Sequence, residues 1–212
     1  MNLQKLIDQI KPLAKRFPVL YPAWQATFIN AYVCGEISPK RSYSLSGRQD
    51  VENFAAFIKP TIAHKFVIDI GGGPTAAAYL IRPNGATHII DPLLGTGVAE
   101  DIRTDATQYD VCIFATSLDH LCHVHAGLLE ASRVLKRSGK IIVWSNKEAP
   151  PRNPCVEVDG VWYYAPPGAS DPFHYRQLGM YDVQKEMSNV GFYLTRHQCE
   201  EPDQCFQEYS RC

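Results

Sequence analysis

A run of small residues, Gly71-Gly72-Gly73-Pro74, directly follows the short apolar segment 66–70. An apolar run stopped by glycine and proline is typical of a buried strand that ends in a tight turn. Residues 75–81 have a helical pattern, and residues 87–90 form a second apolar run that ends at Asp91. A strand, a glycine turn, a helix and another strand predict two parallel strands joined by a crossover helix.

Strand and helix patterns keep alternating beyond Asp91. We expect strands over 111–115 and 141–144, with a helix over 124–135 between them that is closed by Ser138 and Gly139. This alternation predicts an α/β fold with a Rossmann-like, doubly wound, mostly parallel sheet and helices on both faces.

The C-terminal part interrupts and then ends this alternation. Segment 146–172 is rich in proline, glycine and aromatic residues, and Asp159-Gly160 within it predicts a β-hairpin insertion. Further elements are expected as a helix over 181–190 ended by Gly191, a strand over 192–196, a turn at 201–203 and an antiparallel strand over 205–209.

The first sixty residues read as helical. Apolar periodicity predicts helices over 3–13 and 24–33, and a third begins near Asp50 as its N-cap and stops at Pro60. We therefore expect an N-terminal helical region, 1–60, that belongs to the same domain as 61–212 and closes over a substrate.

Length and charge limit the classes of function. The chain has 212 residues, 21 basic and 22 acidic side chains, and a formal net charge of -1. A chain of this length usually folds as one domain. The balanced charge argues against a protein that holds nucleic acid mainly through phosphate contacts, because these need a basic surface. No stretch reaches the roughly 18 apolar residues of a membrane-spanning helix, so we expect no membrane partner.

Cysteine usage and the N-terminal segment indicate the compartment. Seven cysteines are scattered along the chain without a Cys-x-x-Cys pair, which predicts reduced thiols in a cytoplasmic protein. Lys5 and Asp8 interrupt the apolar pattern of the N-terminal segment, unlike a secretory signal.

The glycine turn and Asp91 together suggest a ligand. A glycine turn before a helix lets the backbone approach an anionic group closely. Asp91 ends the next strand, twenty residues after Gly71, where a carboxylate can accept hydrogen bonds from ribose hydroxyls. These residues predict an adenosine-containing ligand at the carboxyl ends of the strands. The alternative is a tight turn beside a surface aspartate.

Several ordered motifs resemble the class I S-adenosylmethionine-dependent methyltransferases, in particular their small-molecule (type 11-like) members. The resemblance covers about residues 66–196 and rests on Asp69 with Gly71-Gly72-Gly73-Pro74, Asp91, Tyr109-Asp110-Val111, Thr116-Ser117-Leu118-Asp119-His120-Leu121, Arg133-Val134-Leu135-Lys136-Arg137-Ser138-Gly139-Lys140 and Gly191-Phe192. It implies S-adenosylmethionine as cofactor, with S-adenosylhomocysteine as product, and a small-molecule methyl acceptor.

The resemblance also implies a cofactor site. Asp69 orders the glycine turn (Gly71, Gly72 and Gly73) and the methionine end of the cofactor, and Asp91 takes the ribose hydroxyls. The expected contacts to the adenine are Pro92, Leu93, and Asp101 with Ile102, with Asp105 as the second choice for the acid. Thr116 and Ser117 are expected to line the methionine side. Only seventeen residues separate Asp91 from Tyr109, so the helix and strand that the family has there are expected to be shortened or lost.

Methyl transfer needs a base only where the acceptor loses a proton. His120 follows the strand at 111–115, and His174 follows the aromatic insertion; both are candidates for the base, and both have a structural role as the alternative. His120, Cys122, His123 and His125 have the wrong spacing for one ion, because structural zinc sites use paired, separated ligands. We expect no metal.

Aromatic side chains are the candidates for acceptor binding, because such residues often line small-ligand pockets. They are Trp162, Tyr164, Phe173, Tyr175 and Tyr43. An ordinary core between the helical region and the sheet is the alternative.

Two other functions stay open. Gly71-x-Gly73-x-x-Ala76 also matches the dinucleotide pattern, which suggests an NAD(P)-dependent oxidoreductase, although a second mononucleotide-binding half is not recognisable. Thr75 stands where the methyltransferases often have glycine, and with the shortened segment after Asp91 this suggests a catalytically silent binding or scaffold protein. The oligomeric state is not predicted.

Overall fold

The structure is a computed structural model that describes residues 48–72, 87–91, 94, 96–121, 123–149, 154–158, 161–164 and 178–212. For 154–158 and 161–164 it describes the backbone alone. The helices predicted over 3–13, 24–33 and 75–81 lie outside the described residues.

Six strands of the described chain form one sheet. They are β1 (Val67–Ile70), β2 (Thr87–Ile90), β3 (Tyr109–Ala115), β4 (Leu135–Asn146), β7 (Phe192–Glu200) and β8 (Gln204–Arg211). Their order is β2-β1-β3-β4-β8-β7. The first four are parallel, and β8 is antiparallel to both neighbours, β4 and β7. The predicted mostly parallel sheet with an antiparallel C-terminal strand is confirmed.

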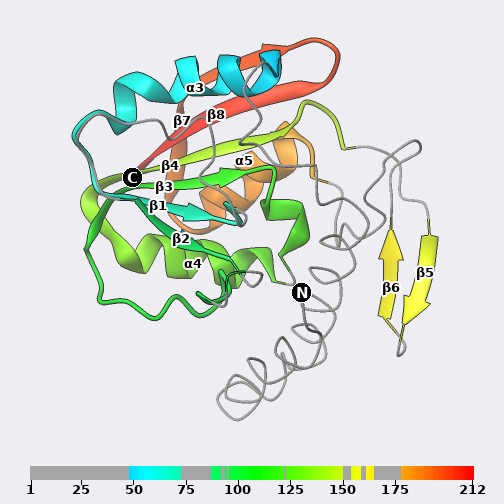
Figure 1. Cartoon of the computed structure of the whole chain (residues 1–212), viewed down its shortest axis with the longest axis horizontal. Coiled ribbons are helices and arrows are strands. Elements are labelled where there is room, and N and C mark those ends of the chain that lie inside the picture. The colour runs from blue at the N-terminus through cyan, green and yellow to red at the C-terminus, as the bar shows by residue number, and fades with distance from the viewer. Residues whose placement is uncertain are drawn as a thin grey trace.

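Helices cover both faces of this sheet, as predicted (Figure 1). α3 (Gln49–Ile62) lies on one face, and α4 (Val124–Val134) and α5 (Met180–Asn189) lie on the other. Phe54 of α3 packs on Trp144 and Phe206, with ring centroids 5.0 and 5.3 Å away. Leu128 of α4 and Met187 of α5 are fully buried in the core of the opposite face. The sheet is therefore buried between two apolar layers.

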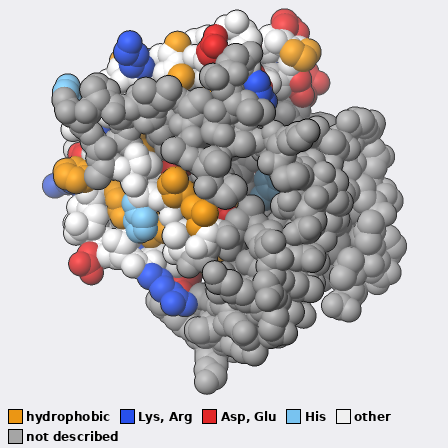
Figure 2. Space-filling model, in the orientation of Figure 1, with side chains coloured by type: hydrophobic (Ala, Val, Ile, Leu, Met, Phe, Trp, Pro, Cys, Tyr) orange, Lys and Arg blue, Asp and Glu red, His pale blue; other side chains and the backbone are white. Residues whose placement is uncertain are grey.

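The ends of α3 differ from the prediction. Its N-cap is Arg48, and Asp50 lies inside the first turn, where its carboxylate accepts a 2.9 Å hydrogen bond from the Val51 amide. Pro60 lies inside the helix, which ends two residues later at Ile62. The charges of α3 complement the helix dipole, with Asp50 and Glu52 in the first turn and Lys59 in the last. Figure 2 shows basic and acidic side chains at the top of the molecule, where α3 lies in Figure 1.

A charged group holds α3 on the sheet. Glu208 of β8, only 4% exposed, accepts hydrogen bonds from Lys140 at 2.5 Å, Arg196 at 2.7 Å and Thr61 at 2.6 Å. Arg196 also donates to the Phe57 carbonyl of α3 at 2.8 Å. Burial alone would raise the pKa of Glu208, but these hydrogen bonds and the two cations lower it below its ordinary value.

The start of β4 also differs from the prediction. The helix predicted over 124–135 is present as α4, which ends at Val134, but the strand expected from 141 begins already at Leu135, so that Ser138 and Gly139 lie inside β4. Leu135 pairs with Tyr109, and the register then shifts before Val111 pairs with Lys140. Gly139 fits this irregular stretch because a Cβ there would lie 2.9 Å from the Lys136 carbonyl oxygen.

The predicted hairpin is confirmed, with β5 (Pro154–Val158) antiparallel to β6 (Val161–Tyr164). It forms its own two-stranded sheet and lies to one side of the main sheet (Figure 1). Its turn, Asp159-Gly160, lies outside the described residues.

The turn at 201–203 and the strands around it are confirmed, and they bring two cysteines together. Cys199 of β7 and Cys205 of β8 are opposite each other in the antiparallel register and form a disulfide. The prediction of reduced thiols is wrong for this pair, because strand register places the two side chains side by side.

The segment between β2 and β3 is short, as expected. Its described residues, 94 and 96–108, contain one isolated bridge, Val98 with Asp101, and no strand of the sheet. β2 is consequently an edge strand. Among the described helices, none combines the length and the apolar character that crossing a membrane requires.

Candidate functional site

The candidate site lies where the direction of the sheet's winding reverses. β1 is paired with β2 on one side and with β3 on the other, so the chain leaves β1 towards one edge and continues from β3 towards the other. In open α/β sheets, ligands bind at the carboxyl ends of the strands at such a point. Gly71 directly follows β1 here, and Thr116 directly follows β3.

Gly71 has no room for a side chain. Its φ is +79°, in the left-handed region, and a Cβ there would lie 2.6 Å from Cβ of Ser117. Its amide donates to the Ile90 carbonyl of β2 at 2.8 Å. Gly71 is nevertheless exposed, so the turn offers bare backbone to a ligand.

Asp69 lies beneath this turn. The residue is fully buried in β1, and a Cβ on Gly72 would collide with its carboxylate. Cys112 lies in the neighbouring strand β3, and burial together with the charge of Asp69 raises the pKa of its thiol. The structure thus places a carboxylate directly against the glycine turn; Gly73 lies outside the described residues.

Asp91 follows β2 and is 5% exposed. Its amide donates to the Thr96 hydroxyl at 2.8 Å, and its carbonyl accepts from the amides of Leu94 and Thr96 at 3.1 and 3.3 Å. This short turn fixes the backbone of Asp91 at the end of the strand. Pro92 and Leu93, the expected adenine contacts, lie outside the described residues.

Asp101 and Ile102 are both buried, whereas Asp105 is exposed. Asp101 forms an ion pair with Arg103, Nε to Oδ2 at 3.4 Å. Burial distinguishes the first choice of adenine acid from the second, but it is equally compatible with a structural ion pair.

Two residues of α4 hold this segment and were missed by the sequence reasoning. Glu130 accepts from the Ile102 amide at 3.1 Å, and Arg133 donates to the carbonyls of Ile102 and Thr104 at 2.6 and 2.8 Å. Glu130 and Arg133 also pair with each other at 2.8 Å. Their i, i+3 spacing of opposite charges was the available signal.

Thr116 and Ser117 directly follow β3 and join it to the neighbouring strands. Thr116 has a φ of +53°, an unusual conformation for a β-branched residue, and its amide donates to the Trp144 carbonyl at 3.0 Å. Ser117, 6% exposed, donates its hydroxyl to the Ile70 carbonyl at 2.5 Å. The two strand ends are therefore tied together at the crevice.

His120 lies at the same edge, in the short 3-10 turn Leu118–His120 after β3. It is partly exposed, and its Nε2 lies 4.0 Å from the Asp119 carboxylate. His174 lies outside the described residues. The N-cap of α4 is His123, whose ring accepts from the Ala126 amide.

The predicted acceptor contacts remain predictions. Tyr43, Phe173 and Tyr175 lie outside the described residues, and Trp162 and Tyr164 belong to β6, whose side chains are not described. In the described part of the chain, no three His, Cys, Asp or Glu side chains come together as a metal site would require.

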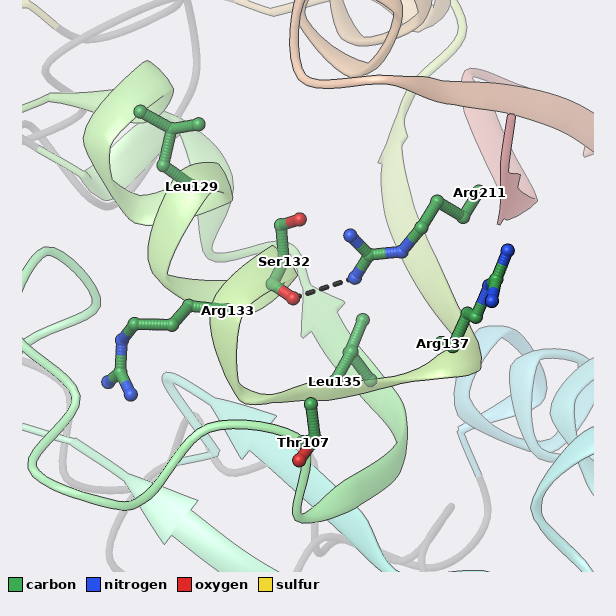
Figure 3. Close-up of a pocket in the computed structure, with 7 residues that line it drawn as sticks. All are labelled: Thr107, Leu129, Ser132, Arg133, Leu135, Arg137 and Arg211. Carbon is green, nitrogen blue, oxygen red and sulfur yellow. Dashed lines mark hydrogen bonds between the residues drawn. The ribbon is translucent and has the colours of Figure 1, made fainter.

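A cavity of about 550 Å³ lies near the amino ends of β3 and β4, away from the crevice. It is lined by Thr107, Leu129, Ser132, Arg133, Leu135, Arg137 and Arg211 (Figure 3). Arg211 points at the last turn of α4 and donates to the Ser132 carbonyl at 2.7 Å. None of the predicted site residues lines it. Arg211 satisfies a carbonyl group in the last turn of α4, which is a structural role.

Comparison with known proteins shows a likeness of fold. No protein-family profile and no curated protein matches the sequence. Among solved structures, the 1,6-didemethyltoxoflavin-N1-methyltransferase of Burkholderia thailandensis, with bound 1,6-didemethyltoxoflavin and S-adenosylhomocysteine, matches with a TM-score of 0.64 and 11% identity over 86% of this chain and 87% of that one.

Two more matches show the range of these structures. A possible histamine N-methyltransferase of Thermotoga maritima has a TM-score of 0.53 and 13% identity, over 88% of this chain and 98% of that one. A cyclase has a TM-score of 0.51 and 10% identity, over 81% of this chain and 85% of that one. The chain has the fold of S-adenosylmethionine-dependent methyltransferases.

Proposed function

We propose that this chain transfers a methyl group from S-adenosylmethionine to a small-molecule acceptor. The observation that carries the proposal is the arrangement at the crevice, where the bare turn at Gly71 lies over the buried Asp69 and beside the end of β3. Asp91 directly follows the adjacent strand β2. The fold and its methyltransferase neighbours support the same assignment.

The two halves of the cofactor suit different parts of this crevice. Backbone at a glycine turn favours a carboxylate, which the amino-acid half carries, so this half belongs near Gly71 and Gly72. The Asp91 carboxylate accepts from the ribose hydroxyls, while Pro92, Leu93, and Asp101 with Ile102 enclose the adenine. Thr116 and Ser117 then lie on the side of the reactive methyl group.

The cofactor supplies a methyl group already activated on a sulfonium sulfur. A lone pair of the acceptor forms the new bond to the methyl carbon while the carbon–sulfur bond breaks in line, leaving S-adenosylhomocysteine. The main contribution of the protein is alignment of the two reactants. Where the acceptor must lose a proton, His120 or His174 takes it.

The acceptor is proposed to bind over the methyl group, between region 1–60 and insertion 146–172. Two of the methyltransferase neighbours are named for nitrogen methylation of small molecules, one of them as a possible histamine N-methyltransferase, which supports the substrate class. Trp162, Tyr164, Phe173, Tyr175 and Tyr43 are the proposed contacts. We propose a cytoplasmic protein, because the described cysteines outside the β7–β8 pair, Cys112 and Cys212, are free thiols. We also propose that it needs neither a membrane nor nucleic acid.

Calorimetric titration with S-adenosylhomocysteine tests the cofactor, with NAD and NADP as controls. We expect micromolar binding of S-adenosylhomocysteine and no binding of either dinucleotide. Binding of a dinucleotide in its place would contradict the proposal and favour the oxidoreductase. Once an acceptor is known, His174→Ala and His120→Ala test which histidine is the base. The variant that lacks the base should lose turnover and keep its affinity for S-adenosylhomocysteine.

A catalytically silent binding protein is the second candidate. It is motivated by the shortened segment after β2, which leaves β2 at the edge of the sheet, because a shared fold does not establish an activity. Cofactor binding without turnover of any small-molecule acceptor would support this candidate.

A further inference from the structure

The hydroxyl of Ser117 makes a bond beyond the end of a strand ladder. The last paired residues of β1 and β3 are Asp69 and Ile113. Ile70 follows, and its carbonyl accepts the 2.5 Å hydrogen bond from Ser117. Ser117 thus joins the tips of the two strands where their backbone pairing has stopped.

The same side chain limits the position of Gly71. A Cβ on Gly71 would lie 2.6 Å from Cβ and 3.2 Å from Oγ of Ser117, so the two residues are in close contact. On its other side the Gly71 amide is bonded to the Ile90 carbonyl at 2.8 Å. The glycine turn is therefore held between the ends of β2 and β3.

The backbone before Ser117 is shaped for this contact. Thr116 has a φ of +53°, and such a conformation in a β-branched residue persists only where surrounding contacts hold it. Ser117 itself is 6% exposed. Because its single hydroxyl proton is donated to Ile70, Ser117 has no donor left for a ligand.

We propose that Ser117 is a positioning residue that fixes the glycine turn for the carboxylate of the cofactor's amino-acid half. This proposal rests on the proposed function and differs from direct contact with the cofactor. Without the brace, Gly71 gains conformational freedom, and binding must restrict it again. The loss of binding affinity is therefore expected for ligands whose carboxylate contacts the turn, and not for ligands that lack this carboxylate.

Ser117→Ala tests this role, with Thr195→Ala as the matched control. Thr195 also donates its hydroxyl to a carbonyl of the neighbouring strand, that of Glu208 at 2.9 Å, but on β7 at the far edge of the sheet. Affinities for S-adenosylhomocysteine and for adenosine are measured by calorimetry, and stability by urea unfolding. Adenosine serves as the probe without an amino-acid half.

We expect Ser117→Ala to weaken S-adenosylhomocysteine binding about fivefold, the equivalent of about 1 kcal/mol, and to leave adenosine binding unchanged. Thr195→Ala is expected to change neither affinity. Equal losses for both ligands in Ser117→Ala, or no loss in the folded variant, would overturn the proposal.

Ser117→Cys keeps the shape of the side chain with a weaker donor and gives the same comparison if Ser117→Ala does not fold. Its affinity for S-adenosylhomocysteine should lie between those of the unaltered protein and Ser117→Ala. If the unaltered protein binds no S-adenosylhomocysteine, the proposed function fails and this proposal fails with it. Normal binding by the unaltered protein with no selective loss in Ser117→Cys defeats only the positioning role.

Discussion

The two ends of the parallel strands are built in different ways. The carboxyl edge is the side of the sheet where β1 and β3 end, and the amino edge is the side where they begin. At the carboxyl edge, Gly71 and Thr116 have left-handed backbone conformations, and Asp69 is buried against a turn. At the amino edge, Arg211 donates to the Ser132 carbonyl in the last turn of α4, and Lys136 pairs with Asp110 of β3. In the described chain, left-handed backbone occurs at both edges, since His64 and Thr107 at the amino edge also have a positive φ; the exposed glycine beside a buried carboxylate is a feature of the carboxyl edge.

This difference indicates which edge has a role beyond stability. An exposed glycine beside a buried carboxylate lets a ligand approach the backbone closely, whereas a cation at a helix C-terminus stabilises the fold. The comparison predicts that substitutions at the carboxyl edge change ligand affinity, and that substitutions elsewhere change only stability.

Gly71→Ala should have the largest effect. The new Cβ meets Ser117 in a backbone conformation with a φ of +79°, so the turn must move. We expect S-adenosylhomocysteine affinity to fall about 100-fold, or about 2.7 kcal/mol, and unfolding free energy to fall by about 2 kcal/mol. Calorimetry and urea unfolding measure the two losses.

Gly191→Ala is the matched control for Gly71→Ala. Gly191 ends α5 with the same φ of +79°, but a Cβ there meets nothing within 4 Å. The substitution should cost about 1 kcal/mol of stability from backbone conformation alone. A loss of cofactor affinity in Gly191→Ala equal to that in Gly71→Ala would show that the close contact with Ser117 does not matter.

Asp91→Ala should weaken S-adenosylhomocysteine binding at least tenfold, the equivalent of about 1.4 kcal/mol, because the ribose hydroxyls lose their acceptor. Asp110→Ala is the control at the amino edge. The Asp110 carboxylate accepts from the Phe66 amide at 2.9 Å and from Lys136 at 3.0 Å, so its loss should reduce stability and leave affinity unchanged. An unaltered affinity in folded Asp91→Ala removes Asp91 from the site.

Local patterns explain why most of the fold was predictable. Some signals determine structure within a few residues: the apolar run before Gly71, the Asp159-Gly160 pair and Gly191 after α5. The strand, the hairpin and the helix end that they predict are present. The early start of β4 depends on the pairing of Leu135 with Tyr109, and the disulfide depends on strand register. These are tertiary effects that local periodicity does not contain.

The candidate site divides in the same way. Asp69, Gly71 and Asp91 follow from their places at strand ends, and the structure brings them to one edge. The bond from Ser117 to Ile70 joins residues 47 positions apart, so sequence reasoning suggested Ser117 only as a ligand contact. Glu130 and Arg133 were likewise invisible as the support of Asp101 and Ile102.

Glu208→Gln should lower stability by about 2 kcal/mol at pH 7, because Arg196 and Lys140 lose a charged acceptor. The folded-state pKa of Glu208 lies below its ordinary value. Its contribution is therefore complete above the unfolded value of about 4.3 and is lost as pH falls through the folded value. Urea unfolding at pH 7 and pH 3 should show the gap between variant and unaltered protein narrowing in acid.

Glu200→Gln is the control for Glu208→Gln. Glu200 of β7 accepts hydrogen bonds from the neutral amides of Asn53 at 2.5 Å and Gln198 at 2.7 Å. The unfolding free energy of Glu200→Gln should therefore stay within about 0.5 kcal/mol of that of the unaltered protein. Neither variant should change cofactor affinity. A gap that widens in acid would contradict the assigned direction of the pKa of Glu208.

Arg211→Ala should have the smallest measurable effect, because the arginine contributes one hydrogen bond to the Ser132 carbonyl and a cation–π contact with Phe192, 5.2 Å from Cζ to the ring centroid. We expect a loss of about 1 kcal/mol in unfolding free energy and an unchanged affinity for S-adenosylhomocysteine. Arg137→Ala, at an exposed position of the same cavity, should change neither quantity. A marked loss of cofactor affinity in Arg211→Ala would mean that the amino edge is coupled to the crevice, and the contrast between the two edges would then fail.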